Sequence, residues 1–449
     1  MLQIIKNVFL ILLFYGSVAC NKYKYQTSTG VEIVYPKGTE HYLNMTSDYI
    51  FNQDTLYTLE LTIPEKALEF IDQNPAAKEY IEGSLIFNQE KISPIKIRYK
   101  GSRGQFWSGL SGDNPNNPSG SKVTTKLSLR LKFNETGVSG KFYGLQNLQL
   151  HSQNNDPSQI RERLAYKLYR DMGVPAPRSV HVKLYINGEY YGLYALTENI
   201  DKQFLSNNFF DATGNLYKDV WPTKVDGNTA SSERDFLMKL ETNILSKTNA
   251  NIITSFANEL VQSEGIESME IVRNRMDIDK IISYIIVDRA IRNDDGAFMW
   301  YGTSNHNYFW YETPKNRKVH LIPWDMDAVF NFQIPFVIQQ QENPIEDSNK
   351  CKMFYKEEWA ITNSNYCDKF TKTIAMFETE HENRIAYFLS EVFAANKVDS
   401  LIEYWCNQIQ QATIEAAELH TDAVSVEVWK KSVNDLRNKI NYSREQFQN

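Results

Sequence analysis

The residues best suited to catalysis lie in one stretch of the chain, from Asn293 to Asp327. Two adjacent aspartates occupy an acidic turn, an asparagine follows, and two further aspartates come after an apolar run: these residues are Asp294, Asp295, Asn307, Asp325 and Asp327. In metal-assisted phosphoryl transfer, one Asp orients the attacking hydroxyl group, while an Asn and a later Asp hold magnesium. The order Asp, Asn, Asp indicates this chemistry. The alternative is that these side chains only form turns, which are often acidic.

A helix and a β-hairpin are expected to position these residues. Apolar residues recur at helical spacing from Asp279 to Arg292, which predicts a mostly buried helix that ends at the acidic turn. Two aromatic or β-branched runs, Asn307 to Tyr311 and Val319 to Ile322, predict the strands of the hairpin. The unit therefore presents carboxylates at the end of a helix, an amide at the start of a strand and two more carboxylates after the next strand.

A second set of polar residues suggests a phosphate-binding surface. A Gly-containing loop that begins at Gly101 leads to Lys126, Arg130 and Lys132, which have even spacing on a predicted strand. Backbone N–H groups in such a turn can bind phosphate, and cations on one face of the strand would add to the attraction. A solvated edge strand after a flexible hairpin explains the same residues equally well.

The remaining pattern indicates strands in the first half and helices in the second. Alternating residues after Thr55 and from 91 to 100 predict strands, and Asn187-Gly188 between alternating runs predicts a hairpin. An amphipathic helix is expected from Ser158 to Gly173, with apolar residues at steps of four. Further helices are expected at about 235–245, 250–263, 277–292, 369–395, 398–419 and 427–447. The segment from Phe332 to Tyr366 has little periodicity and is expected to form a surface loop.

The N-terminus has the features of a targeting segment. Residues 1–19 contain one Lys, an apolar stretch and then small residues before Cys20, which is typical of a signal peptide. Gly-Ser-Val-Ala-Cys is similar to a bacterial lipobox, with Ser17 where Leu is usual, and it predicts a lipid on Cys20. An ordinary cleaved signal peptide is the alternative. With lipidation, we expect a protein of the cell envelope that is anchored to a membrane and is periplasmic or surface-exposed.

Charge and composition exclude several function classes. The formal net charge of the 449 residues is −7, and loss of Lys6 with the signal peptide makes it −8. Because the body is mildly acidic and has no basic cluster, we expect no nucleic acid partner. There is no CxxC or HExxH motif for zinc and no recognisable Ser-His or Cys-His motif for a hydrolase. Cys351 and Cys367 could pair in an oxidising compartment, whereas Cys406 is expected to be a buried free thiol.

The motifs taken together resemble those of the CotH kinase family, a family of atypical kinases first known from spore coats. N-x-D at 293–295, Asn-Tyr at 307–308 and I-P-W-D-x-D at 322–327 are similar to the family signature. Residues 182–201 resemble V-x-L-Y-x-N-G-x-Y-x-G-L-Y-x-L-x-E-x-I-D, and GNLYK at 214–218 resembles another family motif. Residues 156–161 resemble the start of D-P-S-x-L-R. The resemblance extends from about residue 55 to the C-terminus.

The chain departs from the family pattern at one place. The family has R-G-x-S and then K-K-P-Y-x-x-K-F, which Arg103 to Phe106 and Lys126 to Phe133 resemble. Phe106 takes the position of the Ser, Leu127 takes the position of the second Lys, and an insertion rich in Asn and Pro separates the two parts.

The resemblance implies an α+β fold of the atypical protein-kinase-like type with two lobes. The N-terminal lobe would be β-rich and would bind nucleotide, and the C-terminal lobe would be mainly helical. We expect a signal peptide at 1–19, a lipidated N-terminus and tether at 20–53, the β-rich lobe at 54–200 and the helical lobe at 201–449. The helical lobe would carry the metal-binding hairpin at 293–327.

The resemblance also implies a function: transfer of the γ-phosphoryl group of ATP to a hydroxyl group of a protein substrate with Mg²⁺. Asp295 would be the catalytic residue, chosen over Asp294 by the N-x-D spacing, and Asn307, Asp325 and Asp327 would bind the metal. The residues implied in ATP binding are Lys126, Lys132, Arg161, Glu198 and Lys218, whereas Glu162 and Arg163 do not match the family pattern. The alternative function is a non-catalytic, adhesin-like surface protein that binds a ligand in a degenerate kinase groove.

Overall fold

The structure is a computed structural model. It describes residues 22–26, 32–36 and 45–448, apart from 102–105, 107–108, 113, 115–116, 134–139, 225, 247–248, 302–303, 331–352, 358–359 and 365–367. The predicted signal peptide, Cys20, Cys351 and Cys367 lie outside these residues. Two short strands near the N-terminus, β1 (Lys22–Gln26) and β2 (Glu32–Pro36), pair with each other.

Seven strands form a closed barrel in the order β3-β4-β5-β6-β7-β9-β8. Their bounds are β3 Tyr57–Thr62, β4 Ile81–Phe87, β5 Glu90–Tyr99, β6 Leu129–Lys132, β7 Asn147–His151, β8 Ser179–Ile186 and β9 Glu189–Thr197. Buried and exposed residues alternate along β3, so that Leu59 and Leu61 fill the interior. Helix α2 (Glu65–Gln73) and the short helix η1 (Pro75–Ala77) connect β3 to β4.

One parallel contact closes the barrel. Neighbouring strands are antiparallel except β3 and β8, which pair in parallel with Tyr57 opposite Val182. The sequence predicted most of these strands but not their closure, because the pairing joins segments more than a hundred residues apart. The α+β class is confirmed, and the barrel is the specific form that the β-rich part takes.

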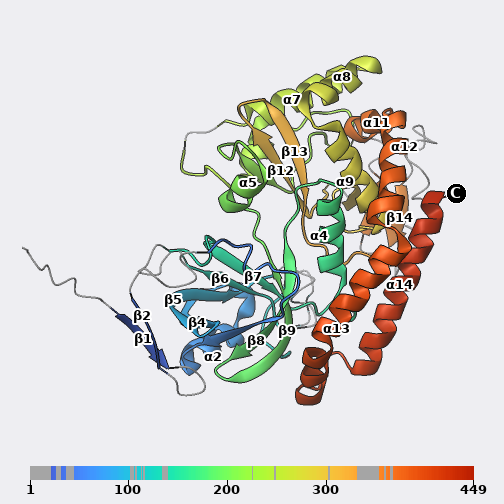
Figure 1. Cartoon of the computed structure of the whole chain (residues 1–449). Helices are drawn as coiled ribbons and strands as arrows, with labels where there is room; N and C mark the ends of the chain where they lie inside the picture. The colour runs from blue at the N-terminus through green and yellow to red at the C-terminus, as the bar shows by residue number, and fades with distance from the viewer. Residues whose placement is uncertain are drawn as a thin grey trace, which may run out of the picture.

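The helices after residue 233 pack around a separate hydrophobic core. They are α6 Glu233–Leu237, α7 Asn251–Gln262, α8 Ile266–Arg275, α9 Ile278–Ala290, α11 Lys369–Ala375, α12 Glu378–Tyr387, the π-helix η3 Phe388–Val392, α13 Ala395–Leu419 and α14 Val426–Gln448. Figure 1 shows the long helices α13 and α14 side by side, with α13 reaching down to the barrel. In the part of the chain that the structure describes, no helix is both long and apolar enough to cross a membrane.

Helices α4 (Arg161–Asp171) and α13 connect this core to the barrel. The Tyr190 hydroxyl on β9 donates to the carbonyl of Ala412 on α13 at 3.0 Å. The Arg163 guanidinium lies over the Trp405 ring, with its central carbon 4.3 Å from the ring centre. The first turn of α4 is packed between the barrel and the helices, so its charged residues Arg161, Glu162 and Arg163 are buried.

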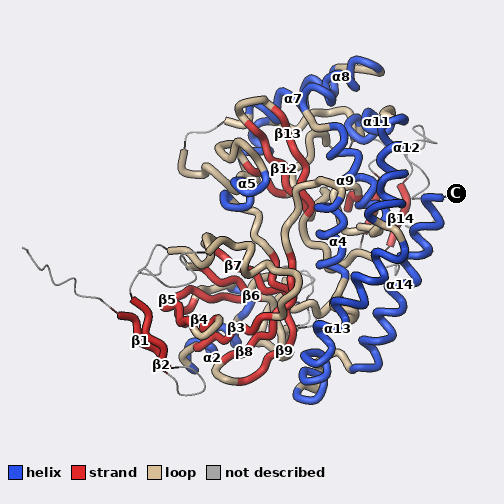
Figure 2. Tube along the Cα trace, viewed as in Figure 1, coloured by secondary structure: helices blue, strands red, loops and turns tan. Residues whose placement is uncertain are grey.

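A small sheet in the order β10-β12-β13 carries the predicted hairpin (Figure 2). Strand β10 covers Leu216–Lys218, β12 covers Tyr308–Thr313 and β13 covers Lys318–Pro323, with Tyr308 opposite Pro323. The predicted hairpin is confirmed, as is the buried helix before it, which is α9. Helix α5 (Lys202–Asn208) precedes β10 and begins at Asp201, whose side chain accepts from the backbone of Gln203 and Phe204.

Two local predictions were wrong. The helix expected at 235–245 is only the short α6, and residues 241–246 form a loop. The segment 332–366, expected to be a loop, contains β14 (Met353–Glu357) and β15 (Ala360–Ser364), which pair with each other; β15 also pairs with β11 (Met299–Tyr301). Cys406 is a free, half-buried cysteine.

Candidate active site

A cavity of about 960 Å³ lies between the barrel and the β10-β12-β13 sheet. Strands β5, β6 and β7 supply one wall. The other wall consists of the turn before α5, Lys218 on β10, the loop 241–246, Phe309 on β12 and Asp325 after β13. The barrel and the predicted metal-binding hairpin therefore border the same space.

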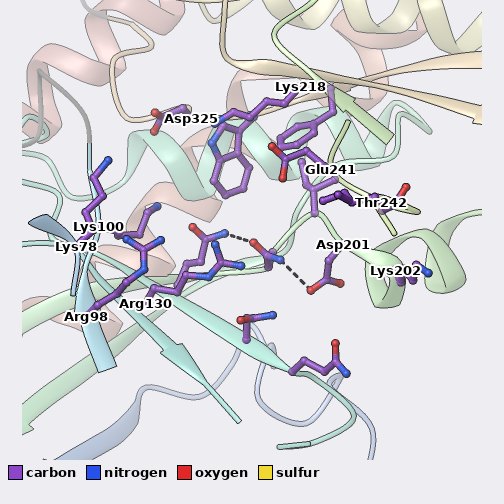
Figure 3. Close-up of a pocket in the computed structure, with 18 of the residues that line it drawn as sticks. Lys78, Arg98, Lys100, Arg130, Asp201, Lys202, Lys218, Glu241, Thr242 and Asp325 are labelled. Atoms are coloured by element: carbon purple, nitrogen blue, oxygen red, sulfur yellow. Dashed lines mark hydrogen bonds between the residues drawn. The ribbon is translucent and has the colours of Figure 1, made fainter. Parts of the chain in front are cut away.

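Positive charge dominates the cavity wall. Six cationic side chains line it, namely Lys78, Arg98, Lys100, Arg130, Lys202 and Lys218, against three acidic ones, Asp201, Glu241 and Asp325. Figure 3 shows four of these cations gathered on the barrel side, with Asp325 and Lys218 across from them. A polyanion such as a nucleotide phosphate chain would fit this distribution of charge.

The cations on the barrel side repel one another. Arg98 and Arg130 are direct partners on β5 and β6, and like charges in that relation destabilise a sheet. Burial, followed by the charges of Arg98 and Lys218, lowers the pKa of Lys78. This part of the barrel therefore retains an excess of positive charge that an anionic ligand would relieve.

A buried chain of polar groups connects the cavity to helix α4. Lys100 follows β5, and its Nζ lies 2.6 Å from Nε2 of His151 on β7. Nδ1 of His151 lies 2.7 Å from Oε1 of Glu162 on α4, and that oxygen also accepts from the Thr197 hydroxyl at 2.9 Å. Burial lowers the pKa of Lys100 to about 8, although the charges of Asp325 and Glu162 oppose the shift.

The acidic turn after α9 directs one aspartate toward the hairpin. The Asn293 amide donates to Asp288 Oδ1 at 2.8 Å, which fixes the turn against the helix. Asp295 then accepts two hydrogen bonds from the Asn307 amide, at 2.7 Å on its carbonyl and 2.9 Å on Oδ2, and Oδ1 lies 2.8 Å from His306 Nε2. Its side chain is 40% exposed and so remains reachable.

Asp294, the neighbouring candidate, has a different environment. It is buried, and burial raises its pKa to about 7 although the positive charge of Arg292 acts in the opposite direction. Of the two adjacent aspartates, Asp295 is therefore the one that contacts Asn307 and faces the hairpin.

Asp325 and Asp327 follow β13. The Asp325 backbone N–H donates to the Tyr166 hydroxyl on α4 at 3.0 Å, and its side chain lines the cavity. Asp327 is buried one turn further on. Burial raises its pKa well above the usual value, and the negative charges of Asp325, Glu162, Asp295 and Asp156 raise it further. Several carboxylates are thus concentrated in a small, poorly solvated region.

Lys218 is the predicted ATP-binding residue that does line the cavity. Its Nζ lies 4.0 Å from the Asp219 carboxylate and 5.7 Å from the centre of the Phe309 ring. Asp219 lies close to the hairpin, because its Oδ1 is 3.5 Å from the Tyr308 backbone nitrogen. Burial raises the pKa of Asp219, against the effects of Lys218 and His306.

Two other predicted ATP-binding residues have structural partners elsewhere. Lys126 donates to the carbonyl of Leu193 at 2.7 Å and lines a separate cavity of about 560 Å³ next to the α13–α14 turn. Glu198 is 2% exposed and forms an ion pair with Arg178 at 2.6 Å. Neither lines the central cavity, because each is held by its own partner in another part of the barrel.

Arg161 and Lys132 are also absent from the wall of the central cavity. Arg161 Nε lies 3.4 Å from Asp156, at the N-terminus of α4. Lys132 is at the far end of β6, with its Nζ 5.9 Å from the centre of the Tyr80 ring. The assignment of these two residues, and of Lys126 and Glu198, to ATP binding stays a prediction without support from the geometry.

Sequence reasoning missed several residues of the site, namely Lys100, His151, Glu162, Asp219 and His306. Glu162 had been set aside because it does not match the family pattern, but it is buried beside the cavity. Lys100 carried one usable signal: it ends an alternating strand directly before a glycine turn. His151 and Glu162 carried none, because their relation depends on how β7 and α4 pack.

The residues near Asp325 suit magnesium in their chemistry. Among the described residues, no group of three or more His, Cys, Asp or Glu side chains is arranged to hold a metal ion. Magnesium, however, commonly binds through one or two carboxylates together with water and substrate phosphates. Glu162 Oε2 is buried without a hydrogen-bond partner, and the crowded charge at Asp327 would be relieved by a cation. The carboxylates of Asp325 and Asp327 and the amide oxygen of Asn307 are of the ligand type that magnesium prefers.

The sequence of this chain is similar to those of known proteins. The family model for "CotH kinase protein" matches residues 97–447 of this chain. The chain is similar to inner spore coat protein H of Bacillus subtilis (strain 168), with 21% identity over 287 residues, which are 63% of this chain and 71% of that protein. It is also similar to an inner spore coat protein H-like protein of the same organism, with 41% identity over 56 residues, which are 12% of this chain and 18% of that protein.

The chain also has a distant likeness to a solved structure. The chain matches the crystal structure of the Helicobacter pylori proinflammatory kinase CtkA with 11% identity and a TM-score of 0.21. The match covers 80% of this chain and 96% of that one.

Proposed function

Because this chain belongs to the CotH kinase family, we propose that it transfers the γ-phosphoryl group of ATP to a hydroxyl group of a protein with the help of Mg²⁺. The observation that carries the proposal is the cavity with cations on its barrel wall and Asp325 opposite them. Phosphoryl transfer requires this combination, because the protein contributes mainly positioning and charge neutralisation.

The cationic wall would bind the phosphates of the nucleotide. Lys218 lies on the same side of the cavity as Asp325, and Lys100 lies across from Asp325 and is affected by its charge, so these two lysines are the first candidates. Lys100 takes the place of the predicted Lys126 in this proposal, because its amine reaches the cavity whereas that of Lys126 is bonded to a carbonyl elsewhere. Arg98 and Arg130 would add charge further along the wall.

The acidic hairpin would supply the other half of the chemistry. Asp325, Asp327 and Asn307 would hold Mg²⁺, which would neutralise the phosphate charge when bound. Asp295 would orient the acceptor hydroxyl and accept its proton. Its 40% exposed side chain supports this role, since an acceptor on another protein must reach it. His306 and Asn307 hold the Asp295 carboxylate in place.

We further propose that the protein works in the cell envelope, held to a membrane by a lipid on Cys20. The sequence of residues 1–20 supports this proposal. The phosphoacceptor would be a protein of the same compartment.

Replacing the proposed metal ligand Asp325 tests the enzymatic function. We expect Asp325→Asn to lower Mg²⁺-dependent transfer from labelled ATP by at least about 100-fold, because metal stabilisation of the phosphates contributes several kcal/mol. Glu82→Gln is a matched control, since Glu82 is exposed on the barrel surface, away from the cavity wall, and pairs with Lys96. Full activity of Asp325→Asn would refute the assignment.

Nucleotide binding can be measured separately from activity. ATP at 100 times its dissociation constant should raise the free energy of unfolding by about 2.7 kcal/mol, which a thermal shift with and without Mg²⁺ would detect. If the protein does not respond to any nucleotide, the adhesin-like alternative is favoured over the kinase.

A further inference from the structure

We propose that His151 is a positioning residue that couples the Lys100 amine to the Glu162 carboxylate. Its imidazole ring contacts both groups, so the negative charge of Glu162 acts on the amine through the ring. The proposal rests on the proposed function only in that Lys100 would contact the nucleotide. In protein kinases, a Lys and a Glu of this kind pair directly. Here the imidazole lies between them, so the histidine would set both the position and the charge of the lysine.

When Lys100 is an ammonium group, the hydrogen-bond distances fit one arrangement of protons. An ammonium group can only donate, so Lys100 Nζ donates to Nε2 of His151 over 2.6 Å. The imidazole proton must then be on Nδ1, which donates to Glu162 Oε1 over 2.7 Å. In this arrangement the ring lies between the positive charge of Lys100 and the negative charge of Glu162.

Burial makes this connection strong. Glu162 and His151 are 1% and 5% exposed. Within the described part of the chain, no ion pair joins Lys100 directly to a carboxylate; its close polar contact is the imidazole. Because water does not screen the chain, polarisation of the ring by Glu162 should make Nε2 a better acceptor for the ammonium group.

Other groups fix the ring and the glutamate, so that the chain has little freedom. The Trp324 ring meets the His151 ring edge to face, with ring centres 5.8 Å apart, and the Thr197 hydroxyl donates to Glu162 Oε1. Glu162 lies in the first turn of α4. A movement of α4 would therefore change the environment of the lysine in the cavity.

The pH dependence of Lys100 acetylation tests the connection directly. The probe is N-hydroxysuccinimidyl acetate on the whole protein, with modification of each lysine measured by mass spectrometry from pH 6 to 10. The charges that act on Lys100 come from Asp325, Glu162, Lys218 and Arg130. Of these four charged groups, the test changes Glu162 alone. Lys126 is the internal control, because it is equally buried and bonded to a carbonyl.

We expect Glu162→Gln to shift the Lys100 midpoint downward by about one pH unit, which is the usual effect of losing an interacting opposite charge. His151→Asn, whose amide can replace only the Nδ1 side of the ring, should shift the midpoint in the same direction. The amide of His151→Gln can still accept from Lys100. In this background, adding Glu162→Gln should shift the Lys100 midpoint by less than Glu162→Gln does in the wild type. The Lys126 midpoint should stay constant throughout.

An unchanged Lys100 midpoint in folded Glu162→Gln and His151→Asn would overturn the proposal, as would equal shifts from Glu162→Gln with and without His151. Thermal unfolding identifies any variant that fails to fold, and either single variant is sufficient for the test. The result does not depend on kinase activity. If ATP does not bind to the wild type but the shifts occur, the proposed function fails and the connection through His151 holds.

Discussion

Lys100 and Lys126 are equally buried, but their amines contact different kinds of group. Burial lowers the pKa of each amine to about 8. The Lys126 amine is bonded to the Leu193 carbonyl, next to the smaller cavity, whereas Lys100 meets an imidazole and borders the cationic cavity. A perturbed lysine is therefore not in itself evidence of a functional site. The type of partner separates the two cases, since a backbone carbonyl only holds the amine and an imidazole with a carboxylate can tune it.

Two buried glutamates show the same contrast. Glu198, predicted to bind ATP, is in an ion pair with Arg178, whereas Glu162, which the family pattern excluded, belongs to the chain that reaches the cavity. In both pairs, the residue that matched a motif has a partner within the barrel wall. The residues without a motif, Lys100 and Glu162, each contact His151 on a different element, β7. A residue at a motif position can therefore stabilise the fold as readily as it can take part in the chemistry.

The largest effect expected from this comparison is on stability. Glu198→Gln should lower the free energy of unfolding by about 3 kcal/mol, because the Arg178 guanidinium loses its buried carboxylate partner and keeps the exposed Asp48 as a counter-charge. ATP affinity, measured on the folded protein, should be unchanged. Urea denaturation followed by tryptophan fluorescence gives the first quantity and calorimetric titration the second. A large loss of affinity with normal stability would place Glu198 in the site after all.

The next effect concerns activity and separates the two lysines. Lys100→Met should lower phosphoryl transfer by about 100-fold, because it removes a preorganised cation near the transferred group. Lys126→Met keeps the aliphatic part of the side chain and should leave transfer within about twofold of the wild type, with at most about 1 kcal/mol lost through the unpaired Leu193 carbonyl. Equal losses of activity in both variants would contradict the distinction.

The smallest effect is a dependence on pH. A lysine whose pKa is lowered on folding binds fewer protons in the folded state, so stability should rise between about pH 8 and pH 10.5. Each Met variant should remove part of this rise. ATP affinity should instead fall above pH 8 as Lys100 loses its charge, and only Lys100→Met should abolish that fall. Denaturation and binding curves over this range test both statements.

Local patterns in the sequence predicted the helices and strands. Contacts between residues far apart in the sequence determine which side chains meet at the site. The hairpin, α4 and α9 follow from periodicity and turn residues within each segment. Lys126 lies outside the central cavity for a physical reason: β6 begins only at Leu129, so the two-residue alternation does not extend back to it. The alternation did hold for Arg130, which lines the cavity. His151 and Glu162 meet across β7 and α4, and no spacing along the chain expresses that contact.

The backbone at two proposed metal ligands has a consequence for evolution and engineering. Asn307 and Asp325 have φ angles of +66° and +59°, a region that side chains other than Asn, Asp and Gly rarely adopt. Alanine at either position would combine a lost ligand with a strained main chain, and glycine would relax the loop while removing the ligand. The shape of these two turns therefore restricts the available residues almost as narrowly as chemistry does, and a descendant that lost its activity could keep both residues for folding alone.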